Sequence, residues 1–137
     1  MEKRTFIALV ALFASTTPAL HAVSVQSLID KNRIHIRNGV LNLRNMNIHS
    51  LQGLQNIKNP LSIKKIVLSA NKISKLNEDF FEVFKNLEAL DLSDNKITHL
   101  VDDYFEDNKR LRTLNLSFNR INKITSDAFN DMHSLVE

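Results

Sequence analysis

The feature that most constrains this 137-residue sequence is an internal repeat with a period of 24 residues. Three consecutive units begin at Ile63, Leu87 and Leu111, and each aligns with the next without a gap. An earlier unit, residues 38–62, fits the same pattern with one extra residue. Self-similarity at a fixed period is the signature of stacked structural units. We therefore expect one small unit of structure, repeated along an axis, in place of a single closed core.

Each unit contains a pair of apolar residues separated by one residue, which is polar in three of the four units. The pairs are Leu41/Leu43, Ile66/Leu68, Leu90/Leu92 and Leu114/Leu116. Alternation of this kind is the period of a strand with one buried face. We therefore predict one short strand in each unit and expect these strands to stack in parallel.

An asparagine follows the strand in three of the four units, at Asn71, Asn95 and Asn119. The chain must turn there, and the turn leaves backbone N–H and C=O groups inside the stack. An amide side chain both donates and accepts hydrogen bonds, so a column of asparagines can satisfy these groups. The first unit has Met46 at this place, and terminal repeats are commonly atypical.

Two further apolar columns follow the asparagine. The first comprises Ile73, Ile97 and Ile121, and the second comprises Phe81, Phe105 and Phe129. Between them lie short polar stretches such as 77–79 and 125–127, which combine residues typical of a helix N-cap with acids. Each unit is therefore predicted to be a strand, a turn and a short helical or irregular segment.

This pattern, L-x-x-L-x-L-x-x-N with a downstream phenylalanine, resembles the leucine-rich repeat family over residues 38–137. The resemblance is specific, because three consecutive units match at the leucine, asparagine and phenylalanine columns together. It implies an α/β repeat solenoid, a short curved horseshoe with parallel strands on its concave face and short helical or irregular convex segments. It also implies that the concave face binds a partner.

The N-terminus has the pattern of a secretory signal peptide. A basic pair precedes the apolar run 6–14, and small residues follow it. The run has nine residues, far short of the ~20 needed to span a bilayer. We expect residues 1–22 to be removed after Ala22, with cleavage after Ala19 as the weaker alternative. The mature protein would then lack a transmembrane segment and be secreted, periplasmic or held in the cell envelope.

The start of the mature chain is predicted to cap the repeats. Apolar residues in 24–30 fall on one helical face. Asn38-Gly39 joins two alternating runs, and this dipeptide is a strong hairpin signal because both residues accept a positive φ. The expected division is a signal peptide at 1–22, a cap of helix and strand at 23–37, four repeats at 38–134 and an incomplete fifth repeat at 135–137.

No similar cap follows the last repeat, because Leu135 opens a fifth unit that stops at once. Ile124 and Met132 are therefore expected to be partly open to solvent. One interpretation is weak self-association through the uncapped C-terminal end. The other is a truncated remnant or assembly unit of a longer leucine-rich-repeat protein, with no independent binding function.

The residues that carry chemistry elsewhere do not form a catalytic pattern. The chain has no cysteine and two glycines, which excludes thiolate sites and a glycine-rich phosphate loop. The histidines after the signal peptide are His35, His49, His99 and His133, and no two have the i, i+4 spacing of a helical metal pair. The serines that recur at one repeat position indicate a structural role. We expect no enzyme activity, no metal and no cofactor.

Charge is distributed unevenly along the chain. Residues 23–75 hold nine Lys/Arg and one acid, whereas residues 76–137 hold seven Lys/Arg and thirteen acids, so their net charges are +8 and −6. The basic part contains no Phe, Tyr or Trp on which bases could stack. We therefore expect no nucleic-acid partner.

The remaining candidate site is the outward face of the predicted strands. Its residues are Val40, Asn42, Arg44, Lys65, Val67, Ser69, Ala89, Asp91, Ser93, Thr113, Asn115 and Ser117. This set is small, mixed and polar, and no deep pocket is expected on it. Such a face suits a protein or peptide better than a small molecule, which needs a cavity of its own size. The sequence thus predicts an exported, non-catalytic module for protein–protein interaction.

Overall fold

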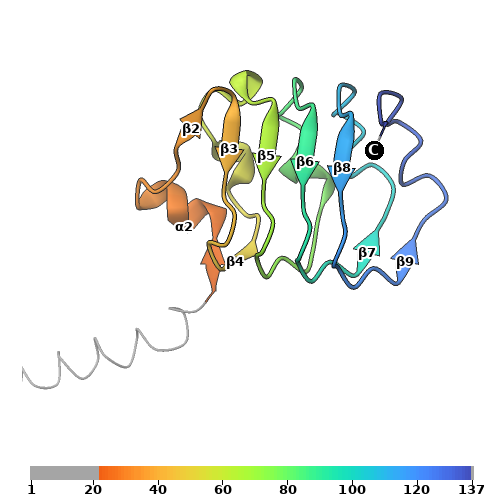
Figure 1. Ribbon diagram of the computed structural model, residues 1–137, viewed down its shortest axis with the longest axis horizontal. Coiled ribbons are helices and arrows are strands. Elements are labelled where there is room, and N and C mark those ends of the chain that lie inside the picture. The colour runs from red at the N-terminus through yellow and green to blue at the C-terminus, as the bar shows by residue number, and fades with distance from the viewer. Residues whose placement is uncertain (1–21, 137) are drawn as a thin grey trace, which may run out of the picture.

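The computed structural model describes residues 22–136 (Figure 1). The predicted signal peptide, residues 1–22, lies outside the described residues except for Ala22. Within the described part of the chain, no helix is long and apolar enough to cross a membrane.

The repeats form a main sheet of five strands. In spatial order these are β2 (Ile36–Arg37), β3 (Val40–Asn42), β5 (Lys65–Val67), β6 (Ala89–Asp91) and β8 (Thr113–Asn115). β3, β5, β6 and β8 are parallel, and their central residues Leu41, Ile66, Leu90 and Leu114 stand in register. The prediction of one strand per unit, stacked in parallel, is therefore confirmed.

Two smaller parallel pairs follow the turns of the repeats. β1 (Val23–Ser24) pairs with β4 (Ile48–Ser50), and β7 (His99–Leu100) pairs with β9 (Lys123–Ile124). Figure 1 shows β4, β7 and β9 in a row along the lower edge of the main strands. The rest of each unit is irregular apart from three single-turn 3-10 helices. These are η2 (Leu54–Asn56), η3 (Pro60–Ser62) and η4 (Glu78–Phe80).

The polar stretches expected to be helical differ in outcome. The stretch 77–79 contributes to η4, with Asn77 at its N-cap and two acids in its first turn. The stretch 125–127 forms turns without a helix. There the Thr125 hydroxyl donates to the Asp102 carboxylate in the preceding repeat, so it links two repeats and does not cap a helix.

The core consists of the predicted apolar columns. Leu41, Ile66 and Leu90 are at most 1% exposed, and Phe81 and Phe105 are at most 3% exposed. The rings of these two phenylalanines lie 5.6 Å apart between centroids, so neighbouring repeats pack directly on each other. Burial of one such side chain contributes about 1.5–3 kcal/mol.

The predicted asparagine column is present, and Asn95 shows how it works. Its Oδ1 accepts from the backbone N–H of Ile73 at 3.0 Å, and its Nδ2 donates to the carbonyls of Leu68 and Leu92, each at 3.0 Å. Two of these partners belong to the preceding repeat. The side chain is 6% exposed, so these bonds form out of water.

Asn71 and Asn119 make the same connections to the repeats before them. Each asparagine therefore reaches backward along the stack. The backbone N–H of Met46 donates to Asn71 Oδ1 at 3.0 Å. Because no earlier repeat precedes the first one, an asparagine in place of Met46 would lack the turn that its counterparts bridge.

The residue before the asparagine column has a left-handed backbone in every repeat. The φ angles are 54° at Asn45, 57° at Ala70, 52° at Asp94 and 55° at Phe118. Asparagine and aspartate tolerate this conformation, whereas other side chains lose about 1–2 kcal/mol in it. Phe118 is also 85% exposed, so its ring gains little from packing.

The N-terminal end of the stack is covered by a helix. α2 (Val25–Asp30) is capped by Ser24, whose Oγ accepts from the Ser27 N–H at 3.1 Å, and it buries Val25 and Leu28. Gly53 permits this close packing. Its φ is 91°, and a Cβ there would lie 2.5 Å from the Cβ of Gln26.

The predicted hairpin is also present at this end. Asn38 and Gly39 have φ angles of 51° and 74°, and β2 runs antiparallel to β3. β2 covers residues 36–37, at the C-terminal end of the cap predicted for 23–37. Helix and strand together cover the first repeat.

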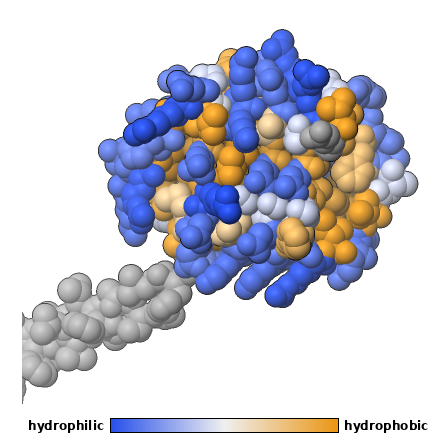
Figure 2. All heavy atoms as spheres, in the orientation of Figure 1, coloured by the Kyte–Doolittle hydropathy of each residue, from blue (hydrophilic) through white to orange (hydrophobic). Residues whose placement is uncertain are grey.

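The last repeat is less enclosed. Ile124 is 55% exposed and Phe129 is 40% exposed, whereas their counterparts Leu100 and Phe105 are 2% and 3% exposed. Figure 2 shows hydrophobic surface gathered on the side where the last repeat lies. The expectation that Met132 is open is wrong, since this residue is 6% exposed. The Val136 N–H donates to the Arg112 carbonyl at 2.8 Å, as the Arg112 N–H does to the Glu88 carbonyl one repeat earlier, so the chain after Met132 continues the pattern of the repeats. Met132 takes the place in this pattern that fully buried Phe84 has two repeats earlier.

Candidate interaction surface

We define the strand face as the side of the main sheet that points away from the apolar core. The register aligns eight of the twelve predicted residues in two rows across the strands, which are Val40, Lys65, Ala89 and Thr113, and Asn42, Val67, Asp91 and Asn115. The other four follow the ends of the strands by two residues and are Arg44, Ser69, Ser93 and Ser117. Their exposure differs. Lys65 and Asn115 are exposed, whereas Ser69 is only 6% exposed and offers little surface.

Polar side chains at the ends of these strands are held by the backbone. Asp91 Oδ1 accepts from the Ser93 N–H at 3.0 Å and from its hydroxyl at 2.6 Å. Asn115 Oδ1 accepts from the N–H and hydroxyl of Ser117 in the same way. These hydrogen bonds fix the orientation of the two side chains. They also give the recurrent serines the structural role that their position predicts.

Asp91 is the one carboxylate among the twelve residues. Partial burial raises its pKa, but hydrogen bonds from the Ser93 side chain and backbone and from Ser69, together with the charge of Arg44, outweigh burial. The pKa of Asp91 therefore lies below its ordinary value of 3.8. The residue remains charged at neutral pH and contributes a fixed negative charge to the middle of the face.

The structure adds three residues that were not predicted to lie on this face. His35, Arg37 and Met46 line a shallow hollow together with Val40, Asn42 and Arg44. The antiparallel pairing explains this, because Arg37 stands opposite Val40 and must point to the same side of the sheet. The alternation in residues 33–37 (RIHIR) was the available signal, since apolar Ile34 and Ile36 imply outward His35 and Arg37.

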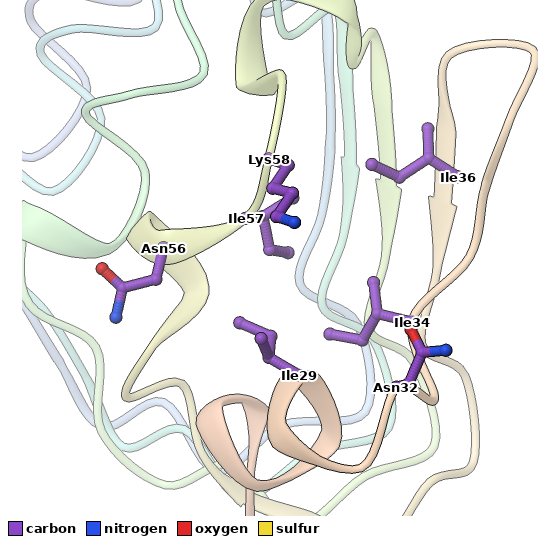
Figure 3. Close-up of a pocket in the computed structure, with 7 residues that line it drawn as sticks. All are labelled: Ile29, Asn32, Ile34, Ile36, Asn56, Ile57 and Lys58. Atoms are coloured by element: carbon purple, nitrogen blue, oxygen red, sulfur yellow. The ribbon is translucent and has the colours of Figure 1, made fainter.

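A second cavity lies behind the cap, with a volume of about 210 Å³. In Figure 3 the side chains of Ile29, Ile34, Ile36 and Ile57 surround it, while Asn56 points away. Asn56 Nδ2 donates to the Gln26 side chain at 2.8 Å, outside the apolar space. Asn32 and Lys58 also line this cavity, but the isoleucines make up most of the lining. We therefore interpret it as imperfect packing between α2 and the first repeat.

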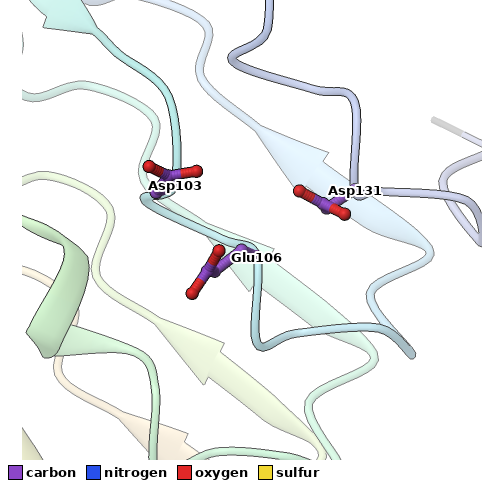
Figure 4. Close-up of side chains that lie close together, drawn as sticks. All are labelled: Asp103, Glu106 and Asp131. Atoms are coloured by element: carbon purple, nitrogen blue, oxygen red, sulfur yellow. The ribbon is translucent and has the colours of Figure 1, made fainter.

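An acidic cluster lies away from the strand face. Ligand atoms of Asp103, Glu106 and Asp131 are within 4.8 Å of one another (Figure 4). Asp131 also pairs with Lys109 at 3.2 Å, which offsets part of the negative charge. Exposed carboxylates of this kind are common without a bound ion, and the cluster adds no chemistry to the strand face.

Comparison with known proteins finds one matching sequence family and similar solved structures. The sequence pattern of the family described as "Leucine rich repeat" matches residues 61–121 and 85–137. The chain is similar to a solved structure of the Toll–Spatzle complex from Drosophila, with 33% identity over 55% of the chain and a TM-score of 0.53. It is also similar to a structure of TLR13 with ssRNA13, with 27% identity over 70% of the chain and a TM-score of 0.56.

These similarities concern a part of much longer proteins. The chain spans 10% of the matched chain in the first structure and 13% in the second. No curated protein matches the sequence.

Proposed function

Because this chain belongs to the leucine-rich repeat family, we propose that it is a non-catalytic module that binds a protein or peptide partner through its strand face. The main support for this proposal is that the twelve side chains belong to one surface. On it, the Asp91 and Asn115 side chains are fixed by hydrogen bonds from the backbone N–H groups of Ser93 and Ser117. A preoriented surface loses less side-chain entropy on binding. We also propose that this face is the concave side of a curved solenoid.

Exposed Phe118 supports a binding role. It lies three residues after the end of β8, and it is 85% exposed in a left-handed conformation. Its counterparts are exposed or half-buried even between two repeats, so a further repeat would not fully cover this position. An aromatic kept at such a place suits a contact residue. Of the two similar structures, the Toll–Spatzle complex favours a protein partner, whereas the TLR13 structure is a complex with single-stranded RNA.

We further propose that the protein is exported and acts in a secreted, periplasmic or envelope location. The basic pair, the apolar run 6–14 and the small residues up to Ala22 support this. Mass spectrometry of the exported protein should find Val23 at the N-terminus. An intact Met1 on protein recovered from the cytosol alone would contradict export.

Site-specific photo-crosslinking tests the binding face. A photoreactive residue replaces Asn115 on the strand face or, as a control, Glu82 on an exposed irregular segment, both of which are solvent-exposed. A partner should form an adduct from position 115 and not from position 82. Equal adducts from both positions, or an adduct from position 82 alone, would refute the strand face as the site.

The last repeat favours a second candidate function, that of an assembly unit. Ile124 and Phe129 are exposed, although the equivalent residues of earlier repeats are buried. In those repeats the next repeat of the stack covers these positions. The unit could then belong to a longer repeat protein or self-associate weakly through this surface. Sedimentation equilibrium across a salt series tests self-association. Salt should strengthen it if apolar burial dominates, and a strict monomer at high concentration would contradict it.

A further inference from the structure

Positive charge is concentrated on the half of the strand face next to the cap. Arg37 on β2 and Arg44 after β3 line the same hollow as His35. Lys65 on β5 stands beside Val40 in the register, at the border of this hollow. Ion pairs among residues 22–136 join Lys64 to Glu88, Lys85 to Asp107 and Lys109 to Asp131, so none involves these four side chains.

The nearest carboxylate on the face, Asp91, offsets this charge only in part. The charge of Arg44 helps to lower the pKa of Asp91, but Asp91 lies two strands away from β3 in the sheet order. Its carboxylate also accepts hydrogen bonds from the backbone and hydroxyl of Ser93. The cap half therefore presents three positive charges, from Arg37, Arg44 and Lys65, against the one negative charge of Asp91.

The floor of the hollow is apolar. Val40 and Met46 are half-buried there, between the exposed side chains of Arg37 and Arg44. A methionine adapts its shape to the group that packs on it. The hollow thus offers an apolar contact with arginines on its rim, which fits a chain segment that carries carboxylates beside an apolar side chain.

We propose that this cap hollow, formed by His35, Arg37, Val40, Asn42, Arg44 and Met46, binds an acidic, amphipathic segment of a protein partner. Carboxylates of the segment pair with Arg37 and Arg44, whose planar guanidinium groups can each bind a carboxylate through two hydrogen bonds. An apolar side chain of the segment packs on Val40 and Met46. This inference rests on the proposed function and specifies the chemistry of the partner.

A nucleic acid fits the same charges less well. Its phosphates recur evenly, so a strand that crosses the sheet from the hollow would meet the charge of Asp91. The residues that line the hollow include no Phe, Tyr or Trp for base stacking. The apolar floor would also remain uncovered beneath a phosphate backbone. A short acidic peptide segment avoids all three difficulties.

The test uses two labelled peptides. In the acidic peptide glutamate alternates with leucine, and in the glutamine peptide every glutamate is replaced by glutamine. Fluorescence anisotropy in low-salt buffer measures their affinity for the protein. The acidic peptide should bind, and the glutamine peptide should bind at least tenfold more weakly. The double variant Arg37→Gln/Arg44→Gln should lose roughly tenfold in affinity for the acidic peptide, since each exposed ion pair contributes roughly 1.4- to 5-fold.

A matched control removes the same charge elsewhere. Arg120 and Lys123 are exposed in the last repeat, after the turn and outside the main sheet. The variant Arg120→Gln/Lys123→Gln should bind the acidic peptide like the wild type. Circular dichroism and melting curves should be unchanged in both double variants, because all four side chains are exposed.

Three results would overturn the inference. These are equal affinities for the two peptides, equal losses in the two double variants, and stronger binding of a single-stranded oligouridylate than of the acidic peptide. Self-association abolished by Arg37→Gln/Arg44→Gln would also overturn it, because a second copy would then be the occupant. A crosslink from position 115 that persists while the peptide fails to bind would leave the proposed function standing and refute only this inference.

Discussion

The two ends of the repeat stack use the same kinds of side chain and bury them to different extents. At the cap end, α2 and β2 cover the first repeat, and Leu41, Leu43 and Ile48 are at most 1% exposed. At the other end, Ile124 and Phe129 are 55% and 40% exposed. The cap end also contains the cap hollow with Arg37 and Arg44, whereas the strand-face positions of β8 are uncharged.

This difference shows that a repeat position does not determine burial by itself. Phe129 and Phe105 have the same place in the pattern, and only Phe105 lies between two repeats. Stability should therefore be a sum of contributions from each repeat and each interface with a neighbour. A substitution should cost most where a neighbour stands on both sides.

The largest effect is expected for the phenylalanine column. Phe81→Ala should lower the free energy of unfolding by about 3–5 kcal/mol, because the ring is fully buried and leaves a cavity. Phe129→Ala should cost clearly less, since 40% of this residue is already exposed. Urea denaturation measures both. Equal losses would mean that the last repeat is as tightly packed as the interior.

Substitutions in the asparagine column should also cost more stability in the interior than in the last repeat, but the losses should be smaller than for phenylalanine. Asn95→Ala leaves buried backbone groups of Ile73 and Leu68 without partners, at a cost of about 1–3 kcal/mol. Asn119 makes equivalent bonds but is half-buried, so water can replace part of them after Asn119→Ala. Thermal melting compares the two variants. A larger loss for Asn119→Ala would reverse the expected gradient.

These columns are the part of the fold that the sequence predicts best. Leu90, Asn95 and Phe105 recur with a fixed period because each must fit the same neighbour on either side. Asn108 was not predicted as part of the core. It is 1% exposed in the column of Phe84, and its Nδ2 donates to the carbonyls of Phe81 and Phe84. Its polar sequence neighbours suggest a loop, and only the three-dimensional packing reveals its partners.

The candidate surface was predictable only in part. The outward positions of the repeat strands follow directly from alternation. His35 and Met46 join them because β2 pairs antiparallel with β3 and because the first turn brings Met46 to the same hollow. Ser69 is buried, and a hydrogen bond from it helps to lower the pKa of Asp91 in the next repeat. Contacts between repeats of this kind leave no periodic signal.

A substitution at the left-handed turn position of Phe118 should increase stability, whereas the variants above should decrease it. Phe118→Gly should raise the free energy of unfolding by about 1 kcal/mol, since glycine adopts φ near 55° without steric cost and little packing is lost from an exposed ring. Asp94→Gly is the matched control and should change stability less, because aspartate tolerates this conformation. A destabilised Phe118→Gly variant would show that the ring packs on the fold.

The smallest effect concerns the charge of Asp91. Because its folded-state pKa lies below the ordinary value of 3.8, the carboxylate stabilises the fold above that pH, and the contribution is lost as pH falls through the folded pKa. Asp91→Asn should keep the hydrogen bonds from Ser93, as Asn115 does with Ser117. The variant should therefore lose less stability than the wild type in urea titrations between neutral and strongly acidic pH. An identical pH dependence would contradict this account.

The first repeat is packed between the cap and the second repeat, whereas the last repeat is held from one side only. Residue-resolved amide hydrogen exchange tests this difference directly. We expect slow exchange for Leu43 and Leu68, whose N–H groups bond to the next repeat at 2.8 Å, and faster exchange across β8 and β9. Uniform protection from β3 to β9, or faster exchange at the cap than at the last repeat, would contradict it.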